Sequence, residues 1–209
     1  EMSSDRKIYK RESEEARRDA LIAAAMDLVA MGGPQAATVR AIADRAGVTP
    51  GLIRHYFSSK EELTRAAYRR LMEMLTRDSA TAIQSGDLDP KGRLVAFVSA
   101  SLRPPVVDPK RLGLWAGFLN ALRTDPAMRE VHEQGYRAYR DILEMLIAHL
   151  PRPAVQPDQI RRDAIACNAV IDGLWLEGSA LPDGFAAGEL ESIGLGAISA
   201  ILNIDLTGA

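Results

Sequence analysis

The stretch from Thr38 to Lys60 constrains the fold of this chain more than any other part of the sequence. Thr38 is a good N-cap, because its hydroxyl can accept a hydrogen bond from an unpaired backbone N–H of a first helical turn. Gly47 can adopt the left-handed conformation that ends a helix. Thr49 is a second cap, with Pro50 at the first helical position after it. The spacing predicts two short helices around a tight turn, which is a helix-turn-helix.

The second of these helices has an apolar inner side and a polar outer side. Val48, Ile53 and Phe57 predict the buried side. The outer side is basic and aromatic, which suits a helix that enters the major groove of DNA. Arg40 and Arg54 are each candidates to hydrogen-bond either the edge of a guanine base or a backbone phosphate, and the sequence does not decide between these two contacts. The predicted DNA contacts are Thr38, Arg40, Thr49, Pro50, Gly51, Arg54, His55, Tyr56 and Lys60.

Lys60 follows the motif at the start of a further helix. Ser59 and Glu62 have the spacing of a capping box and predict that start. A cation in a first turn opposes the positive end of the helix dipole, and a bound phosphate would reverse this effect. We therefore expect Lys60 to bind phosphate, with an ordinary solvated lysine as the alternative. For His55, a packed or surface histidine is the alternative to a DNA contact.

The rest of the chain also reads as helices. A helix is expected from about Ser13 to the Gly32-Gly33-Pro34 stop, after a polar and mobile segment at 1–12. Aspartate precedes proline at three later points, and each pair predicts a helix start. We expect an all-α fold of about nine helices without a sheet. The later helices are expected at about 60–84, 90–102, 109–123, 126–150, 156–180 and 186–203.

Charge and composition narrow the class of protein. The net charge is −2, but residues 1–60 hold ten basic and eight acidic residues, whereas the remainder holds sixteen and twenty. A mildly basic N-terminal part followed by an acidic remainder suits DNA binding through the N-terminal part. The one cysteine, Cys167, excludes an internal disulfide and a cysteine-based zinc finger. No apolar run approaches the roughly 18 residues of a membrane span, so we expect a soluble, cytoplasmic protein.

The order of these parts resembles the DNA-binding domain of TetR-family transcriptional regulators over about residues 14–65. The resemblance implies a homodimer, usually a repressor, that binds a palindromic operator. A C-terminal helical domain would bind a small molecule and thereby weaken DNA binding. A transcriptional activator, the alternative to a repressor, would use the same DNA-binding domain. The expected domains are 1–62 and 63–209. The motifs that carry the resemblance are Thr38–Ala43, Ala46–Val48, Gly51–Phe57 and Ser59–Leu63.

A second resemblance lies in the C-terminal part. The stretches Ala169–Leu176 and Trp115–Phe118 are similar to BetI-type members, which regulate choline and glycine betaine metabolism. A choline-like cation favours an aromatic cage, because ring faces attract quaternary ammonium groups. An unrelated hydrophobic effector is the alternative, and each aromatic is alternatively a core residue. The predicted ligand-binding residues are Trp115, Phe118, Tyr136, Tyr139 and Trp175.

The last helix carries apolar residues on one stripe and small residues beside them. Two such helices from each subunit would form a four-helix dimer interface, and a dimer would reach half-sites about one helical turn apart. The alternative is that the stripe packs only within its own subunit. The predicted interface residues are Ile171, Leu190, Ile193, Ala197 and Ile201.

An enzyme and a protein-interaction module are the rival classes. The sequence holds no phosphate-binding loop, no dinucleotide fingerprint and no closely spaced metal-ligand cluster. Asp172 and Glu177 would point to different helix faces and so make a poor acid–base pair. We therefore expect no catalytic residues, metal or cofactor. The basic set on the helix-turn-helix favours DNA over protein as its partner.

Overall fold

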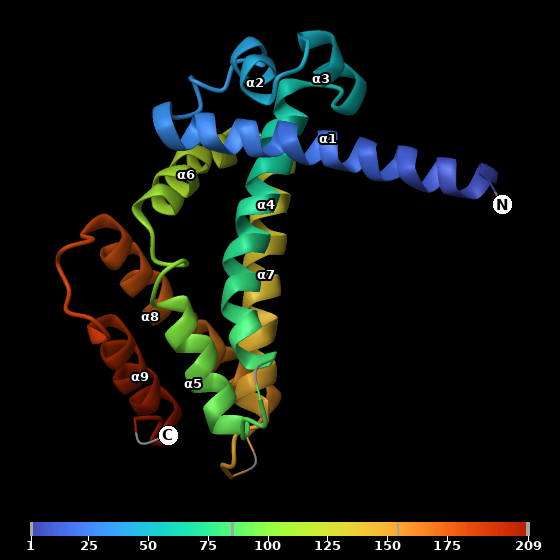
Figure 1. The fold of residues 1–209 in the computed structure, drawn as a ribbon. Coiled ribbons are helices and arrows are strands. Elements are labelled where there is room, and N and C mark those ends of the chain that lie inside the picture. The colour runs from blue at the N-terminus through green and yellow to red at the C-terminus, as the bar shows by residue number, and fades with distance from the viewer. Residues whose placement is uncertain (1, 85, 154, 208–209) are drawn as a thin grey trace. The chain divides into compact units, whose positions relative to one another are not determined.

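The computed structural model describes residues 2–84, 86–153 and 155–207, with side chains described from Glu14 onward. Every regular element in these ranges is a helix (Figure 1), which confirms the predicted all-α class. The α-helices are α1 (Met2–Gly32), α2 (Val39–Ala46), α3 (Pro50–Tyr56), α4 (Lys60–Thr81), α5 (Pro90–Ser101), α6 (Pro109–Leu119), α7 (Pro126–Ala148), α8 (Pro157–Ala180) and α9 (Glu189–Leu202). Short 3₁₀ turns, η1 (Ala82–Gln84) and η2 (Asn120–Arg123), extend α4 and α6.

The helices pack as two compact units. The first unit comprises Glu1–Leu71 and Gly113–Val131, and the second comprises Met72–Leu112 and His132–Ala209. Helices α4 and α7 each begin in the first unit and continue into the second. This packing does not test the predicted domains 1–62 and 63–209, which stay a prediction.

The core of the first unit forms where α1, α2, α3, α4 and α6 bury their apolar faces. Tyr68 of α4 is fully buried, and its ring centroid lies 5.2 Å from that of Phe118 of α6. The backbone of α6 also approaches α1 closely, because a Cβ on Gly117 would lie 2.9 Å from Cγ1 of Val29. Other buried residues of this core are Leu21, Ile22, Ala25, Ile42, Ile53, Phe57, Leu63 and Ala67.

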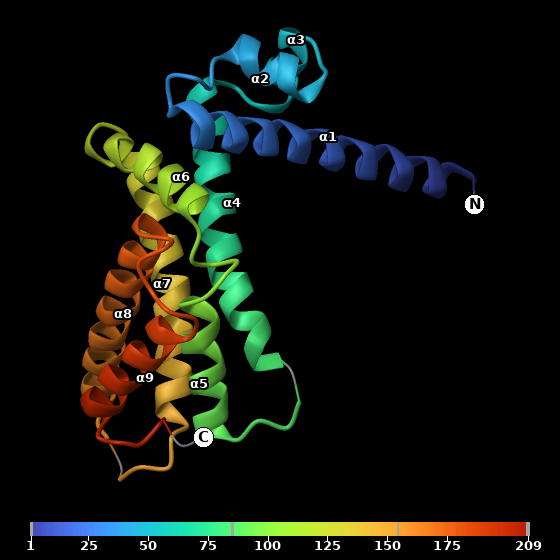
Figure 2. The same ribbon diagram turned by 60° about the vertical axis from the view of Figure 1, so that its left-hand side comes forward.

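The core of the second unit is built from α5, α7, α8 and α9. Helices α8 and α9 lie side by side (Figures 1 and 2), and α9 contributes its buried Leu190, Ile198 and Leu202. Cys167 of α8 is buried in the same core, where burial and then the charge of Asp163 raise the pKa of its thiol to about 12. Such burial of apolar area supplies most of the stability of amphipathic helices.

The predicted aspartate–proline helix starts are confirmed. The backbone N–H of Gly92 donates to Asp89 Oδ1 at 2.7 Å, and that of Lys110 donates to Asp108 Oδ1 at 3.0 Å. Asp125 Oδ1 accepts from the N–H groups of Ala127 and Met128 at 3.0 and 3.2 Å. Each carboxylate therefore satisfies first-turn donors that the helix itself leaves unpaired.

Two predicted boundaries are wrong. Helix α1 begins at Met2 and not near Ser13; the sequence contains no glycine or proline before Gly32, so nothing breaks the helix earlier. Glu1 lies outside the described residues. Helix α9 begins at Glu189 and not at residue 186, because the Glu189 carboxylate accepts the N–H of Ala186 at 2.7 Å and holds the preceding residues as a cap.

Gly194 allows α9 to pack closely on its neighbours, which leads to a prediction. A Cβ there would lie 2.3 Å from Cδ1 of Leu102 and 3.3 Å from Cδ1 of Leu174. Since Leu102 is buried, Gly194→Ala should cost about 1–3 kcal/mol of unfolding free energy through overpacking. The measurement is the free energy of unfolding in urea.

Gly113→Ala is the matched control, because Gly113 is helical and an added Cβ would meet open space. This control should be neutral or more stable by up to about 1 kcal/mol, since alanine favours helix over glycine. Equal stability of the two variants would contradict the close approach at Gly194.

Candidate functional site

The first helix of the helix-turn-helix is held at both ends as predicted. The N–H of Ala41 donates to the Thr38 hydroxyl at 3.1 Å, which confirms Thr38 as the N-cap of α2. At the other end Gly47 is left-handed, with φ 66° and ψ 34°, and its N–H bonds the carbonyls of the last turn. The turn between α2 and α3 is therefore fixed by a cap and by a conformation that glycine favours.

The second helix, α3, presents two different faces. Ile53 and Phe57 are each 2% exposed and anchor it to the first unit's core, and the Arg18 guanidinium lies 4.9 Å from the centroid of the Phe57 ring. Thr49 occupies the N-cap position with extended backbone, but its side chain makes no capping hydrogen bond. Thr49 is therefore the N-cap of α3, as predicted, but without a side-chain hydrogen bond, and Pro50 at the first position has no N–H that would need a partner.

The outer face of this motif is exposed and cationic. Among the described residues, Arg40, Arg54 and Lys60 form no ion pair, whereas the neighbouring Arg45 pairs with Asp27 at 3.0 Å. The charges of the first three are therefore available to an external anion. Of the nine predicted DNA contacts, seven are exposed and two are half-buried: Thr38, Arg40, Thr49, Pro50, Gly51, Arg54 and His55 are exposed, and Tyr56 and Lys60 are half-buried.

His55 and Tyr56 contact each other at the end of α3. Their ring centroids lie 5.1 Å apart at an interplanar angle of 81°, an edge-to-face arrangement. This contact limits the freedom of both side chains beside Lys60. His55 is thus an exposed histidine with one aromatic neighbour, and its contact with DNA stays a prediction.

The start of α4 is capped by two serines and one glutamate. Ser59 Oγ accepts from the N–H of Glu62 at 3.1 Å, as expected for a capping box. The Glu62 carboxylate, however, accepts from the N–H and the hydroxyl of Ser58, both at 2.7 Å, one residue earlier than the expected partner. The hydrogen bond from the Ser58 hydroxyl and then that from its N–H hold the pKa of Glu62 below its usual value. This arrangement fixes the chain between α3 and Lys60.

A network of polar side chains lies inside the second unit. Ser101 Oγ lies within hydrogen-bond distance of three oxygens: the Tyr139 hydroxyl at 2.7 Å, Ser79 Oγ at 2.9 Å and the Phe97 carbonyl at 2.8 Å. Its single proton serves one of these partners at a time. The Tyr139 ring packs on Phe97 with centroids 5.0 Å apart. These hydroxyls join α4, α5 and α7 in the interior.

A carboxylate lies beside this network on α8. Asn168 Nδ2 donates to Asp172 Oδ2 at 3.0 Å, and the Tyr136 hydroxyl also hydrogen-bonds the Asp172 carboxyl. Burial raises the pKa of Asp172 to about 6, although both hydrogen bonds act in the opposite direction. Burial and the Asp172 charge raise the pKa of Tyr136 to about 12, so its hydroxyl stays protonated at neutral pH.

The five predicted ligand-binding aromatics fall in different surroundings. Trp115 and Phe118 belong to the first unit, where Phe118 is a fully buried core residue against Tyr68. Tyr136 and Tyr139 belong to the interior network of the second unit. The indole N–H of Trp175 donates to the Val106 carbonyl at 2.9 Å and so anchors the segment after α5. The ligand role of all five stays a prediction.

Four polar residues of this interior are not predicted from the sequence as part of a site: Ser79, Ser101, Asn168 and Asp172. Asn168 and Asp172 are four residues apart on one helix, and Asp172 interrupts the apolar run from Ala169 to Leu176. An aspartate within such an apolar run indicates a carboxylate that points toward the interior. Glu177 is exposed while Asp172 is half-buried, in agreement with the expectation that they point to different faces.

The predicted dimer residues divide between the two faces of α8 and α9. Ile171 and Leu190 are 3% and 7% exposed and pack in the second unit's own core, so the chain itself already covers them. Ile193 is 46% exposed, and Ala197 and Ile201 are half-buried. The outward faces of the two helices carry Ile165, Ala169, Gly173 and Leu176 on α8, and Ile193, Gly196 and Ala200 on α9, all exposed.

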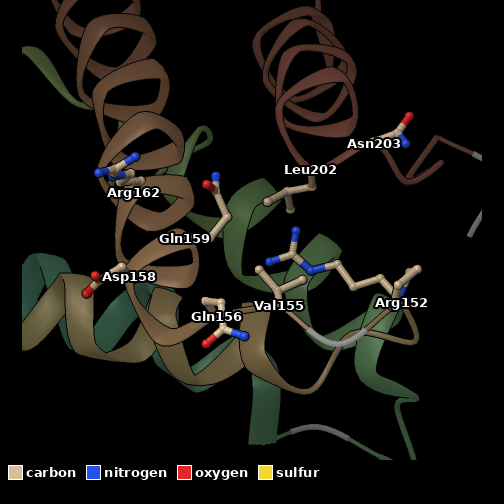
Figure 3. A pocket seen from close by; sticks show the side chains of 9 residues that line it. Arg152, Val155, Gln156, Asp158, Gln159, Arg162, Leu202 and Asn203 are labelled. Atoms are coloured by element: carbon tan, nitrogen blue, oxygen red, sulfur yellow. The ribbon is translucent and has the colours of Figure 1, made fainter.

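A surface groove lies where α8 begins and α9 ends (Figure 3). Arg152 and Gln159 extend toward its centre, whereas Asp158 and Arg162 point away. The Arg152 guanidinium lies 2.8 Å from the carboxylate of Asp163, so its charge is already neutralised by the chain. This groove therefore offers little to attract a charged ligand.

The described residues form neither a membrane-spanning helix nor a metal-binding cluster. No helix in those ranges is long and apolar enough to cross a membrane. Within the same ranges, no three or more histidine, cysteine or acidic side chains gather as they would around a metal ion.

The fold and the capped, cationic motif define a helix-turn-helix DNA-binding protein with a helical C-terminal part. Residues 21–67 match the tetR family of bacterial regulatory proteins, and residues 90–203 match the C-terminal part of BetI-type transcriptional repressors. The chain belongs to the TetR family, with a C-terminal part of BetI type.

Relatives and solved structures agree with this membership. The HTH-type transcriptional regulator BetI of Rhizobium meliloti (strain 1021) is 34% identical over 79% of this chain and 79% of its own. A candidate transcriptional regulator from Pseudomonas aeruginosa PAO1 shares the fold with a TM-score of 0.81 and 30% identity, covering 90% of this chain and 91% of that one. A candidate regulator from Saccharomonospora viridis, solved with choline, has a TM-score of 0.72 at 21% identity over 88% and 96% of the two chains.

The capping glutamate gives a stability prediction. Glu62→Gln should lower the free energy of unfolding at pH 7 by about 0.5–2 kcal/mol, because it weakens a charge-assisted cap. The folded-state pKa of Glu62 lies below its usual 4.5, so the stabilisation by its charge is present above that value and is lost as pH falls through the folded pKa. The measurement is the difference in urea unfolding between wild type and variant at pH 7 and at acidic pH.

Glu61→Gln is the matched control, since Glu61 is exposed in the same first turn and makes no capping hydrogen bond. The Glu61 carboxylate interacts with the helix dipole as that of Glu62 does, but it lacks the hydrogen bonds to Ser58. An equal loss in both variants would attribute the effect to the dipole and contradict the capping role.

Proposed function

We propose that this protein is a homodimeric, ligand-responsive transcriptional repressor that binds a palindromic operator through α2, α3 and the start of α4. The observation that carries the proposal is a set of three cations without an ion pair among the described residues, the exposed Arg40 and Arg54 and the half-buried Lys60. They lie on a motif whose helices are fixed by the Thr38 and Ser59 caps. A rigid scaffold with free guanidinium and ammonium groups is what phosphate and base contacts need.

We propose no catalytic role. The family comprises regulators. The interior carboxylate of Asp172 is hydrogen-bonded by Asn168 and Tyr136, and the raised pKa of Tyr136, about 12, keeps its hydroxyl protonated and therefore a poor nucleophile. A protein-interaction role for the helix-turn-helix is less favoured, because three unpaired cations around an exposed helix suit a polyanion. As a DNA-binding regulator the protein is expected in the cytoplasm.

The outward faces of α8 and α9 are the proposed dimer interface. They expose three large apolar side chains, Ile165 at 37%, Leu176 at 45% and Ile193 at 46%, and small residues lie beside them: Gly173, Gly196 and Ala200. Small residues permit close helix approach, and the large ones supply apolar area to bury. These residues replace Ile171 and Leu190, which the chain's own core already covers.

The effector is proposed to bind in the second unit. The Saccharomonospora viridis protein, which shares the fold at 21% identity, was solved in complex with choline, and this supports a small organic molecule as the effector. Helix α4 is continuous from Lys60 to Thr81 and carries both the capped end beside the DNA-binding face and Ser79 of the interior network. A ligand that changes the packing around Ser79 would thereby shift the population of DNA-competent dimers.

Operator binding tests the proposal. Operator sequences are first selected from random DNA with the wild-type protein, and affinities are then measured over a range of salt. Arg40→Ala and Lys60→Ala should each weaken binding about 10-fold or more, because each removes a cation from both subunits. Loss of a phosphate contact should also reduce the slope of log K against log salt by about one per contact. Arg54→Ala should relax sequence preference if Arg54 reads a base.

Arg93→Ala is the matched control, since Arg93 is an exposed cation on α5 of the second unit. It should leave both affinity and salt slope unchanged. Failure of the wild type to enrich any sequence, or unchanged binding in the Arg40 and Lys60 variants, would contradict the proposed DNA interface.

The dimer interface has its own test. Ile193→Arg should convert the dimer to a monomer at micromolar concentration in light scattering, because it places a charge in an apolar contact that both subunits would share. Met145→Arg is the control, since Met145 is similarly exposed at 44% but lies on α7, a helix outside the proposed interface. A monomeric wild type, or a dimeric Ile193 variant, would refute the assignment.

A further inference from the structure

We propose that the first part of α1, residues 2–20, is a second DNA-binding element, which contacts backbone phosphates beside the half-site of α3 and does not read bases. We call these residues the α1 arm. This inference rests on the proposed DNA-binding function and extends the interface to a surface outside the helix-turn-helix. It starts from the length of α1 and from the distribution of charge around it.

The α1 arm extends beyond the core of the first unit. Among the residues of α1 whose side chains are described, Leu21 is the first that is buried, and residues 15–20 are all exposed. In both views the part of α1 after Leu21 lies against α2 and α3, whereas the arm projects past them (Figures 1 and 2). At 1.5 Å per residue the arm is about 28 Å long. Helices gain most of their stability from packing, so a partner that covers one face of the arm would stabilise it.

The charges of the α1 arm are segregated by face. The arm holds six cations and five acids, so its net charge is only +1. With about 100° per residue, however, all six cations and one acid, Glu14, fall within an arc of about 140°. The other acids, Asp5, Glu12, Glu15 and Asp19, occupy the rest of the circumference. One face is therefore strongly cationic, through Arg6, Lys7, Lys10, Arg11, Arg17 and Arg18.

The cationic face continues the side of α1 that packs on the rest of the first unit. Leu21 and Ala25 are buried and occupy the same arc of the helix. The guanidinium of Arg18 lies 4.9 Å from the centroid of the ring of Phe57, the residue that ends α3. The charge of Arg18 also acts on the Glu62 carboxylate in the first turn of α4. The cationic face thus begins at the junction of α3 and α4 and leads outward along the arm.

DNA is the partner that this face fits. The junction of α3 and α4 carries Lys60, so the cationic face is continuous with the proposed DNA interface. Duplex DNA carries one negative charge per about 1.7 Å of its axis, and a cationic face about 28 Å long can therefore neutralise several phosphates. Such contacts position a protein on the duplex without reading its sequence. A membrane surface fits less well, because acids stand on the opposite side of the arm, where an interfacial helix needs an apolar face.

The test removes two cations of the arm from the full chain. Lys7→Ala/Arg11→Ala and wild type are compared on the operator selected with wild type, flanked on each side by about 10 base pairs, one turn of duplex. At about 0.1 M salt the variant should bind at least tenfold more weakly. The slope of log K against log salt should shrink by about two to four, since a dimer loses four cations. Sequence preference should be unchanged, because phosphate contacts carry no base information.

Two matched controls separate direct contact from net charge. Arg93→Ala/Arg103→Ala removes two exposed cations of the second unit and should leave both affinity and salt slope unchanged. Asp5→Asn/Glu12→Gln adds two positive charges to the opposite side of the arm and should leave the salt slope unchanged. An equal loss of affinity in the first control, or a changed slope in the second, would attribute the effect to net charge and overturn the inference.

Hydroxyl-radical footprinting locates the contact. Wild type should protect sugar positions that Lys7→Ala/Arg11→Ala leaves open, and both proteins should protect the positions contacted by α3. Alanine favours helix, so circular dichroism should show the helical content of wild type in the variant. Should it fail to fold, Lys7→Gln/Arg11→Gln replaces it with the same expected losses. Identical footprints of wild type and variant would overturn the inference.

Failure of this inference and failure of the proposed function give different results. If wild type selects an operator and Lys7→Ala/Arg11→Ala binds it with equal affinity and salt slope, only the role of the α1 arm is overturned. If the arm cations are needed for binding to vesicles of anionic phosphatidylglycerol but not to the operator, the partner is a membrane surface and the inference is likewise overturned. If wild type selects no sequence at all, the proposed DNA-binding function itself is refuted.

Discussion

The capped start of α4 is the interaction on which the rest of the structure depends. Ser59 and Glu62 fix where this helix begins, and the helix then buries Leu63, Ala67 and Tyr68 in the first unit's core. The same helix continues to Ser79, whose hydroxyl joins the interior network of the second unit. A different helix start would rotate the later residues by about 100° per position and exchange buried for exposed ones.

Local chemistry made much of the fold predictable from the sequence. Thr38, Gly47 and the aspartate–proline pairs act within four residues of themselves, so their roles follow from backbone hydrogen-bonding needs alone. The predicted helix ends therefore agree with the structure within a few residues at most boundaries. The start of α1 was missed because no sequence signal marks it, and the exact partner of Glu62 was missed because Ser58 and Ser59 are chemically alike.

Tertiary packing set the limits of prediction at the candidate sites. On α9, Leu190 and Ile193 both belong to an apolar stripe, but only the position of α8 and α5 decides that Leu190 is buried and Ile193 exposed. The sequence does not predict the hydrogen bond between Tyr136 and Asp172, since that bond depends on how α7 packs against α8. Periodicity identifies which residues share a helix face, and it leaves open what that face meets.

The buried position of Cys167 has a consequence for how the protein can receive a signal. With its thiol pKa near 12, the residue holds almost no thiolate at neutral pH, and thiolate is the form that reacts with oxidants and electrophiles. The chain's single sulfhydryl is therefore chemically quiet. Fluorophores or spin labels attached through newly introduced surface cysteines would report on the motion of α4 or α9 without competition from the native residue.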